Sequence, residues 1–514
     1  MKVRQLVQVR KVEIIDMLQG RKNRQMQQKS IKENSILNVI KTLSGIIFPL
    51  ITFPYISRVL GPGNVGKVNF GSTYVSYFSL LASLGISSYA IRECSSVRYD
   101  EKELSRKASE IYSINICMTL ISYILLFCSL LLFRELDKYS YLIILQSSVI
   151  LFTTLGADWI NSAMEDFRYI TYRTIGFQIL ALLMMFVFVH KNSDYYKYAI
   201  TSVIASSGAN IVNMIYRRRY CSIHFTLKMK LKQHMYHILM LFVMLLAQTI
   251  YGSSDTTMLG LMRTDYDVGI YSTAYKVKNI IAQVVVSLAW VVMPRMSLYF
   301  SKNDYEKINK MLKKCLGVMV LIGFPCIAGC MVLSPEIVQI VGGCEFRDAS
   351  VPLVIMMFSF IFDLFGASFL GNMICLPARK EKYFMQACCI SAIVNVILNF
   401  IFIPYGGVNA AACSTVISYF IIFIWLLKNR DKKIKLDYFF DVCKIPFIGS
   451  IVMSLFCIVI KNLIKGIFNI TIVSVIGGAI IYFFIQLKMK NFIFMEFYKN
   501  IISKLYILRK NGHK

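Results

Sequence analysis

Long apolar runs recur along the chain from Ile36 to Leu487, separated by short polar and basic stretches. Each run has about 20 residues, the length that an α-helix needs to cross a bilayer core of about 30 Å. The pattern therefore predicts an all-α polytopic membrane protein with fourteen transmembrane helices. The predicted spans are residues 36–57, 68–90, 110–133, 139–157, 174–190, 198–216, 236–258, 268–294, 315–333, 350–371, 383–402, 408–427, 445–460 and 466–487.

The composition agrees with this prediction. Of the 514 residues, 56% are hydrophobic and only 17% are charged, whereas a soluble domain carries about 25% charged residues. An ordinary soluble protein is therefore excluded. The polar, basic first 34 residues lack the apolar segment of a signal peptide.

Lys and Arg are distributed unequally between the two sides of the predicted membrane. Forty-four of them fall in the tails and in the loops on the side of the termini, and ten fall in the loops on the other side. Basic residues accumulate on the cytoplasmic side of membrane proteins, so we expect both termini in the cytoplasm. The net charge of +29 then marks topology and contact with anionic lipid rather than a nucleic-acid partner.

An internal repeat relates the two halves of the chain. The segment that begins Val65-Gly66 resembles the one that begins Val268-Gly269, and Arg92 and Arg295 each follow 26 residues after the glycine of their own segment. Each half contains an even number of spans, so the repeats are parallel and predict a pseudo-twofold axis along the membrane normal, with a transport pathway between the lobes and alternating access. The predicted organisation is a basic tail (1–34), an N-lobe (35–220), a C-lobe (221–430), two extra C-terminal helices (431–487) and a second basic tail (488–514).

A family resemblance rests on four short segments. These are the run from Phe53 to Pro62, the pair Val65-Gly66, and the segments Leu84-Gly85-Ile86 and Ile91-Arg92-Glu93. Together they resemble the N-terminal signature of Wzx-type polysaccharide flippases, which belong to the multidrug/oligosaccharidyl-lipid/polysaccharide exporter superfamily. The resemblance implies that the chain moves undecaprenyl-pyrophosphate-linked oligosaccharide repeat units to the outer leaflet. Such units are polymerised into lipopolysaccharide O-antigen, capsule or exopolysaccharide, and a polymerase and a chain-length regulator are possible partners.

Only three basic residues lie inside predicted spans, and these are Lys41, Lys276 and Lys278. A cation within the membrane is costly and usually faces a partner or a wet cavity. Lys276 is the stronger candidate for lining the pathway, because Lys278 lies about 200° away around the same helix. Lys41 is close to the cytoplasmic edge, where reaching out to the interface is the alternative to substrate contact.

Three carboxylates are candidates for cavity or ion-coupling groups. Asp255 stands in the polar segment from Gly252 to Thr257, and it either pairs with Lys276 or takes up a coupling cation. Asp363 near the middle of its span provides either a proton or Na⁺ site or a plain interhelical hydrogen bond. Asp158 lies at the inner end of the fourth span. Beyond such H⁺ or Na⁺ coupling, no cofactor is expected.

Arginines near the ends of the spans suit a pyrophosphate, because the guanidinium group forms paired hydrogen bonds with phosphate oxygens. Arg58 lies at the predicted outer mouth, and Arg92 and Arg295 lie at inner ends related by the repeat. The alternative is that the inner arginines only anchor the topology.

The sequence shows no catalytic constellation, so we expect a transporter rather than an enzyme. It contains no P-loop, its five histidines show no arrangement with carboxylates, and its fourteen cysteines show no metal-site spacing. The alternatives left open are a lipid II-type peptidoglycan precursor flippase and a cation-coupled drug antiporter of the same superfamily. A membrane glycosyl polymerase fits less well, because the longest exterior loop, 334–349, is short.

Overall fold

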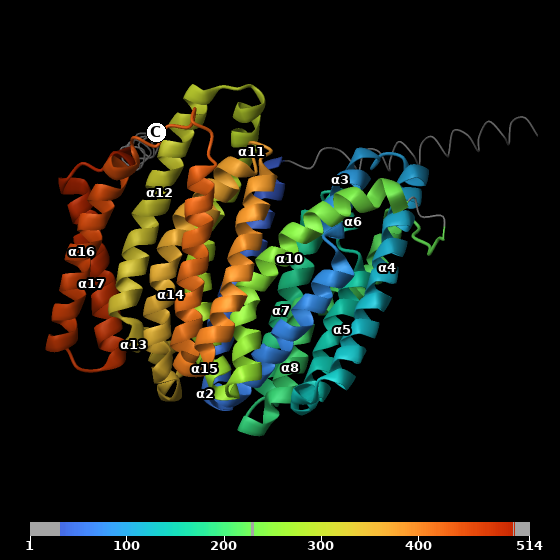
Figure 1. The fold of residues 1–514 in the computed structure, drawn as a ribbon, viewed down its shortest axis with the longest axis horizontal. Coiled ribbons are helices and arrows are strands. Elements are labelled where there is room, and N and C mark those ends of the chain that lie inside the picture. The colour runs from blue at the N-terminus through green and yellow to red at the C-terminus, as the bar shows by residue number, and fades with distance from the viewer. Residues whose placement is uncertain (1–30, 228–230, 497, 499–514) are drawn as a thin grey trace, which may run out of the picture.

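The computed structural model describes residues 31–227, 231–496 and 498, and within these ranges every regular element is a helix (Figure 1). The all-helical class predicted from the apolar runs is thus confirmed.

The first half of the chain contains one very long helix, α2, and a series of shorter ones. Four of the short elements are not α-helical: η3 is a π-helical segment, and η1, η2 and η4 are 3₁₀ turns. The elements are α2 (Ile31–Ser83), α3 (Ile86–Ser96), α4 (Glu101–Leu132), η1 (Arg134–Tyr139), α5 (Ser140–Gly156), α6 (Trp159–Ala163), α7 (Phe167–Phe188), η2 (Asn192–Asp194), α8 (Tyr195–Val203), η3 (Ile204–Gly208), α9 (Ala209–Tyr216) and η4 (Arg217–Arg219).

The second half begins with two long helices, α10 and α11, joined by a tight turn. Thr264 caps α11: its hydroxyl accepts from the Asp267 N–H, and the Asp267 carboxylate accepts from the Thr264 N–H, which forms a capping box. The elements are α10 (Leu231–Met262), α11 (Asp265–Ser301), α12 (Tyr305–Val332), α13 (Ser334–Gly342), η5 (Cys344–Ala349), α14 (Ser350–Asp363), the π-helical η6 (Leu364–Cys375), α15 (Glu381–Lys428), α16 (Phe439–Leu463) and α17 (Ile467–Lys488).

Glycines mark two places where a pair of predicted spans is continuous in secondary structure. Within α2 only Gly61 departs from helical angles (φ 68°, ψ 170°), and within α15 only Gly407 does so (φ 52°, ψ −131°). Both have positive φ, which glycine adopts without steric cost. Each long helix is therefore two helical arms joined at a glycine break.

Two predicted boundaries were wrong. The span expected at 68–90 is interrupted at Leu84 and Gly85, which both have positive φ and end α2 before α3 begins. The segment 334–349, expected as an exterior loop, forms α13 and η5, with Pro335 at the start of α13 where a missing N–H costs nothing.

Ten helical stretches of the described residues are long and apolar enough to cross a membrane. They include Ile40–Ser96 and Glu381–Lys428, which contain the breaks at Gly61 and Gly407, but not α10 or α11. The chain is thus an integral multi-pass membrane protein, and the count of fourteen spans stays a prediction.

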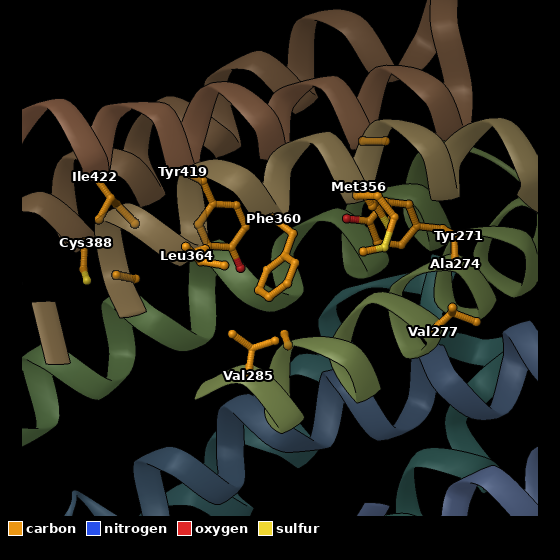
Figure 2. Packing of buried hydrophobic residues seen from close by; sticks show 14 of the residues in the cluster. Tyr271, Ala274, Val277, Val285, Met356, Phe360, Leu364, Cys388, Tyr419 and Ile422 are labelled. Carbon is orange, nitrogen blue, oxygen red and sulfur yellow. The ribbon is translucent and has the colours of Figure 1, made fainter. Parts of the chain in front are cut away.

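Packing divides the helices into groups. In the first half, α2 packs against α4, α5, α7 and α8; in the second, α15 packs against α10, α14 and η6. The core of this second group includes Tyr271, Phe360 and Tyr419 (Figure 2). The final pair, α16 and α17, packs on α12 and α13 at one side of the molecule (Figure 1). The two halves meet where α10 and α11 cross α2.

Candidate functional site

The two halves come closest at a pair of glycines related by the internal repeat. A Cβ atom on Gly66 would lie 1.8 Å from the carbonyl oxygen of Asp265, and one on Gly269 would lie 2.0 Å from that of Pro62. The contact is reciprocal, since Pro62 and Asp265 are separated by the same number of residues as Gly66 and Gly269. Reciprocal contact is the geometry of a twofold axis, and it supports the predicted relation between the lobes.

The same end of the molecule is closed further by α13 from the second half. Ser57 donates to the carbonyl oxygen of Val341 (2.9 Å), and Arg58 donates to those of Pro54 and Ile340 (2.5 Å each). Arg58, predicted to bind pyrophosphate at the outer mouth, thus has two of its nitrogens occupied by backbone carbonyls. We refer to the contacts of Gly66, Gly269, Ser57 and Arg58 as the closed end.

Beyond the closed end, polar side chains link α2 to α10 and α11. Asn69 donates to the Ser272 hydroxyl (2.7 Å), and the hydroxyls of Tyr77 and Thr257 lie 3.0 Å apart. Side-chain hydrogen bonds of this kind join packed membrane helices, and these two place polar groups where α2 meets α10 and α11.

Lys276 lies on this surface. Its ammonium nitrogen is 4.1 Å from the centroid of the Phe53 ring on α2, and the side chain is half-buried. The ion pair predicted with Asp255 is wrong: among the described residues no carboxylate forms a salt bridge with Lys276, and Asp255 has other partners. The Phe53 ring face offers the cation partial compensation and leaves its hydrogen-bond donors available for an anion.

Asp255 is buried in a network contributed by α10, α11 and α15. Its carboxylate accepts hydrogen bonds from Tyr271, Asn395 (3.1 Å), Asn399 (2.5 Å) and Thr415 (2.6 Å). Four donors satisfy the carboxylate as an anion without a basic partner. The two asparagines lie four residues apart and so occupy one face of α15, a spacing in an apolar span that could have drawn attention to them in the sequence.

A buried ion pair was predicted for Lys276, but Lys278 is the lysine that forms one. It donates to Asp363 on α14 (3.0 Å) and to the hydroxyl of Tyr419 on α15 (3.2 Å), and its side chain is 3% exposed. Figure 2 shows Tyr419 beside Phe360 and Leu364 in the core of the second half. The structure therefore places Lys278 inside the second half, with Asp363 and Tyr419 as its partners.

The remaining predicted residues lie apart from this surface. Asp158 pairs with Arg173 on α7 (2.5 Å), a residue that is 8% exposed. Arg92 is exposed and lies beside Glu93 (3.7 Å), while Arg295 is exposed near the end of α11. Lys41 is half-buried in the first turns of α2. Arg92 lies on α3, beyond the break at Leu84 and Gly85, whereas Arg295 lies on the uninterrupted α11.

One buried polar cluster was missed by the sequence. His234 at the start of α10 contacts Glu110 on α4 (3.1 Å) and the hydroxyl of Tyr89 on α3 (2.6 Å). The positions of the five histidines along the chain did not indicate this contact. Contact between residues 124 positions apart leaves no spacing pattern by which to recognise it.

Comparisons with family models agree with the geometry. A model described as "Polysaccharide biosynthesis protein" matches residues 31–300, which include all of the first half and the two helices that cross it. A second, described as "Lipid II flippase MurJ", matches residues 179–502.

Individual relatives are more distant. A probable low-salt glycan biosynthesis flippase of Haloferax volcanii is 30% identical over 33% of this chain, but the match spans only 35% of that relative. A putative O-antigen transporter of Escherichia coli K12 is 21% identical over 72% of this chain and 89% of its own length.

Solved structures establish the fold. The structure of the lipid II flippase MurJ in an inward closed conformation superposes with a TM-score of 0.70 at 15% identity, covering 91% of this chain and 99% of that one. An inward-facing multidrug resistance MATE family transporter of the MOP superfamily gives a TM-score of 0.55 at 13% identity, covering 79% and 98%.

Proposed function

The chain belongs to the polysaccharide biosynthesis protein family, and from this premise we propose that it is a flippase for undecaprenyl-pyrophosphate-linked oligosaccharide repeat units. It would move them from the inner to the outer leaflet of the bacterial plasma membrane, with both termini in the cytoplasm. The observation that carries the proposal is Lys276, a cation on the inter-lobe surface that forms no salt bridge among the described residues.

The barrier to moving the pyrophosphate across the membrane is electrostatic. A pyrophosphate carries its charge across a low-dielectric layer only if cationic, hydrated groups compensate it along the way. Lys278 is neutralised by Asp363 inside the second half and cannot serve without breaking that pair. Lys276 faces α2 with its donors free, so it is the intramembrane cation suited to a phosphate.

Alternating access follows from the closed end. The backbone contacts of Gly66 and Gly269 and the hydrogen bonds from Ser57 and Arg58 to α13 block passage between the lobes at that end. For substrate to leave there, these contacts must separate while the other end closes. Both steps are rigid-body motions of the two lobes relative to each other.

A coupling cation fits best at Asp255. The Asn399 carbonyl oxygen Oδ1 is buried without a hydrogen-bond partner, and carboxylate, amide and hydroxyl oxygens are the ligands that a hard cation such as Na⁺ takes. The Asn399 Oδ1 and the Asp255 carboxylate would hold the ion, which would balance the charge of the buried carboxylate, and one of the four donors to Asp255 would turn away to free an oxygen for it. A proton on Asp255 is the alternative occupant.

We expect that replacing Asp255 with Asn removes Na⁺ dependence. In proteoliposomes, a Na⁺ gradient in one of the two directions should speed transport by the wild-type protein. Transport by Asp255→Asn should not change with a gradient in either direction. Equal responses of the two proteins to the gradient would exclude Asp255 as the cation site.

A second candidate substrate, lipid II, is favoured by a specific observation. The lipid II flippase model matches residues 179–502, and the MurJ structure superposes over nearly the whole chain. The polysaccharide biosynthesis model covers the first half of the chain, including the surface of α2 that Lys276 faces. This match favours a polysaccharide precursor instead.

Deleting the gene distinguishes the two substrates. The proposal predicts accumulation of lipid-linked repeat units on the cytoplasmic leaflet and loss of surface polymer, with cell-wall synthesis unchanged. Mass spectrometry of extracted lipids measures the amount of accumulated repeat units, and a membrane-impermeant lectin reports whether they have reached the outer leaflet. Accumulation of lipid II with normal surface polymer would select the peptidoglycan precursor, and repeat units that reach the outer leaflet unpolymerised would indicate a polymerase.

A further inference from the structure

A cavity of about 540 Å³ lies in the first half of the molecule against α10. Four serines of α2 line it at positions 72, 76, 79 and 83, a spacing that places all four on one helix face. Ser202 and Ser206 contribute from the opposite wall, and Thr249 contributes from α10. None of the residues that line it is charged.

The serine hydroxyls are arranged to accept hydrogen bonds. Ser76 donates to the carbonyl of Thr73 (2.6 Å) and Ser83 to that of Leu80 (3.1 Å), both within their own helix. A hydroxyl whose hydrogen is used in this way keeps oxygen lone pairs that face the cavity. The wall is therefore rich in neutral acceptors.

Gln146 on α5 is an independent observation at the same cavity. Its side chain is 2% exposed, and its Nε2 donates to the Val68 carbonyl (3.0 Å) and the Ser72 hydroxyl (2.9 Å). Its Oε1 is buried against Gly71 of α2, where an added Cβ would lie 2.3 Å from it, so this oxygen is not open to a ligand in the cavity. Gln146 instead holds Ser72 in place, and the Ser72 hydroxyl, which accepts from Gln146, keeps its own hydrogen to donate into the cavity.

The wall opposite α2 is locally irregular. Ser206 lies within the π-helical segment Ile204–Gly208, and Ser202 directly precedes it. π-Helical turns inside α-helices occur frequently at functional sites, because the extra residue re-aims side chains. The irregularity coincides with the two serines that face the cavity.

We propose that this cavity binds the oligosaccharide part of the substrate, through the serines of α2, Ser202, Ser206 and Thr249, with Gln146 holding Ser72 in place. The inference rests on the proposed function and assigns the sugar to a place separate from the pyrophosphate. A wall of neutral hydroxyl and amide groups cannot compensate the charge of a phosphate. The hydroxyl groups of a sugar form hydrogen bonds with neutral groups of this kind. The volume lies within the range of about 300–1,000 Å³ that is usual for small-molecule sites.

The position of the cavity links it to transport. Thr249 belongs to α10, which packs against both α2 and α15, so one wall of the cavity is carried by the half that moves relative to the other walls. A bound sugar would therefore experience a different wall in each conformation. Lys276, on α11, lies outside the lining and is free to hold the charged group.

Two ligands separate sugar binding from head-group binding. The probes are lipid-linked repeat units extracted from the deletion strain and undecaprenyl pyrophosphate without sugar, each titrated onto the purified full-length protein in nanodiscs. The test variant is the double substitution Ser76→Ala and Ser79→Ala. The matched control is Ser148→Ala on α5, a half-buried serine that donates to Leu145 (2.7 Å) in the same local way but lies outside the lining.

The double variant should bind the repeat-unit lipid about fivefold or more weakly, because losing one neutral hydrogen bond costs roughly two- to tenfold in affinity. Its affinity for undecaprenyl pyrophosphate should stay within about twofold of wild type, and Ser148→Ala should bind both lipids normally. Unchanged binding of the repeat-unit lipid, or an equal loss for both lipids, would overturn the assignment of the sugar to this cavity. Failure of the wild-type protein to bind either lipid would instead reject the proposed function.

Discussion

At the scale of single residues, the four charged residues of α10, α11 and α14 that fall in predicted spans differ in their partners among the described residues. Lys278 and Asp363 neutralise each other, Asp255 is satisfied by four hydrogen-bond donors, and Lys276 has only the ring of Phe53. The sequence identified all four charged residues, because an ionisable group in an apolar run stands out. It could not pair them, since their partners come from other helices whose rotation about their axes the sequence does not determine.

This division predicts different consequences for the two lysines. Lys278→Ala leaves Asp363 as an uncompensated buried charge, which costs about 3–5 kcal/mol, so the membrane abundance of this variant should fall sharply. Lys276→Ala removes no pair, so its abundance should stay near wild type while polymer production falls. Quantitative blotting of membranes beside a complementation assay measures both quantities.

A second substitution tests the pairing itself. Asp363→Asn added to Lys278→Ala should restore much of the lost abundance, because the stranded charge is removed. Asp255→Asn should not rescue Lys278→Ala, since Asp255 belongs to a separate network. Rescue by Asp255→Asn but not by Asp363→Asn would show that the pairing differs in the membrane.

At the scale of helices, hydropathy located each apolar helix but missed the features that shape it. The breaks at Gly61 and Gly407, the interruption at Leu84 and Gly85, and the π-helical turns of η3 and η6 fall inside apolar or weakly polar runs. A break of one or two residues hardly changes the mean hydropathy of a 20-residue window. The serine face of α2 left a readable signal in its spacing, which only the cavity made meaningful.

The close crossing of α2 and α11 leads to a prediction at the scale of helices. Gly66→Ala places a methyl group 1.8 Å from the Asp265 carbonyl oxygen, so the helices must separate and the closed end must open. We expect the thiol of Ser57→Cys, in a background where the exposed Cys128, Cys344 and Cys413 are replaced by serine, to become accessible to a membrane-impermeant thiol reagent when Gly66→Ala is added. Reactivity measured in whole cells reports the change.

The control is a glycine three residues earlier on the same helix. A Cβ on Gly63 would meet nothing within 4 Å, so Gly63→Ala should leave position 57 as unreactive as in the parent protein. Equal protection of position 57 in both alanine variants would mean that the glycine contact does not hold the closed end together.

At the scale of the whole molecule, the repeat in the sequence anticipated where the halves touch. Gly66 and Gly269 were noticed only as matching residues, and the structure shows them in reciprocal contact with Asp265 and Pro62. The arrangement of the substrate site was less predictable. The Asn395 and Asn399 network, the cluster of His234 with Glu110, and the serine cavity each combine residues that are far apart in the chain.

The residues, helices and lobes together support one transport scheme. A closed end formed by backbone contacts, an inter-lobe cation and a neutral hydroxyl cavity are the parts needed to carry an amphiphile with a charged link and a sugar head. The scheme requires no nucleotide and no catalytic residue. It depends instead on movement of the two halves relative to each other, which separates the contacts of the closed end.

Transport by the purified protein tests the central claim most directly. Lipid-linked repeat units from the deletion strain are placed in proteoliposomes that contain the wild-type protein, and their exposure on the outer leaflet is followed with a membrane-impermeant sugar-oxidising or lectin probe. The account predicts that the protein accelerates passage between leaflets and that Lys276→Ala, reconstituted in equal amount, is several-fold slower. Passage no faster than in protein-free vesicles, under either sign of Na⁺ gradient, would contradict it.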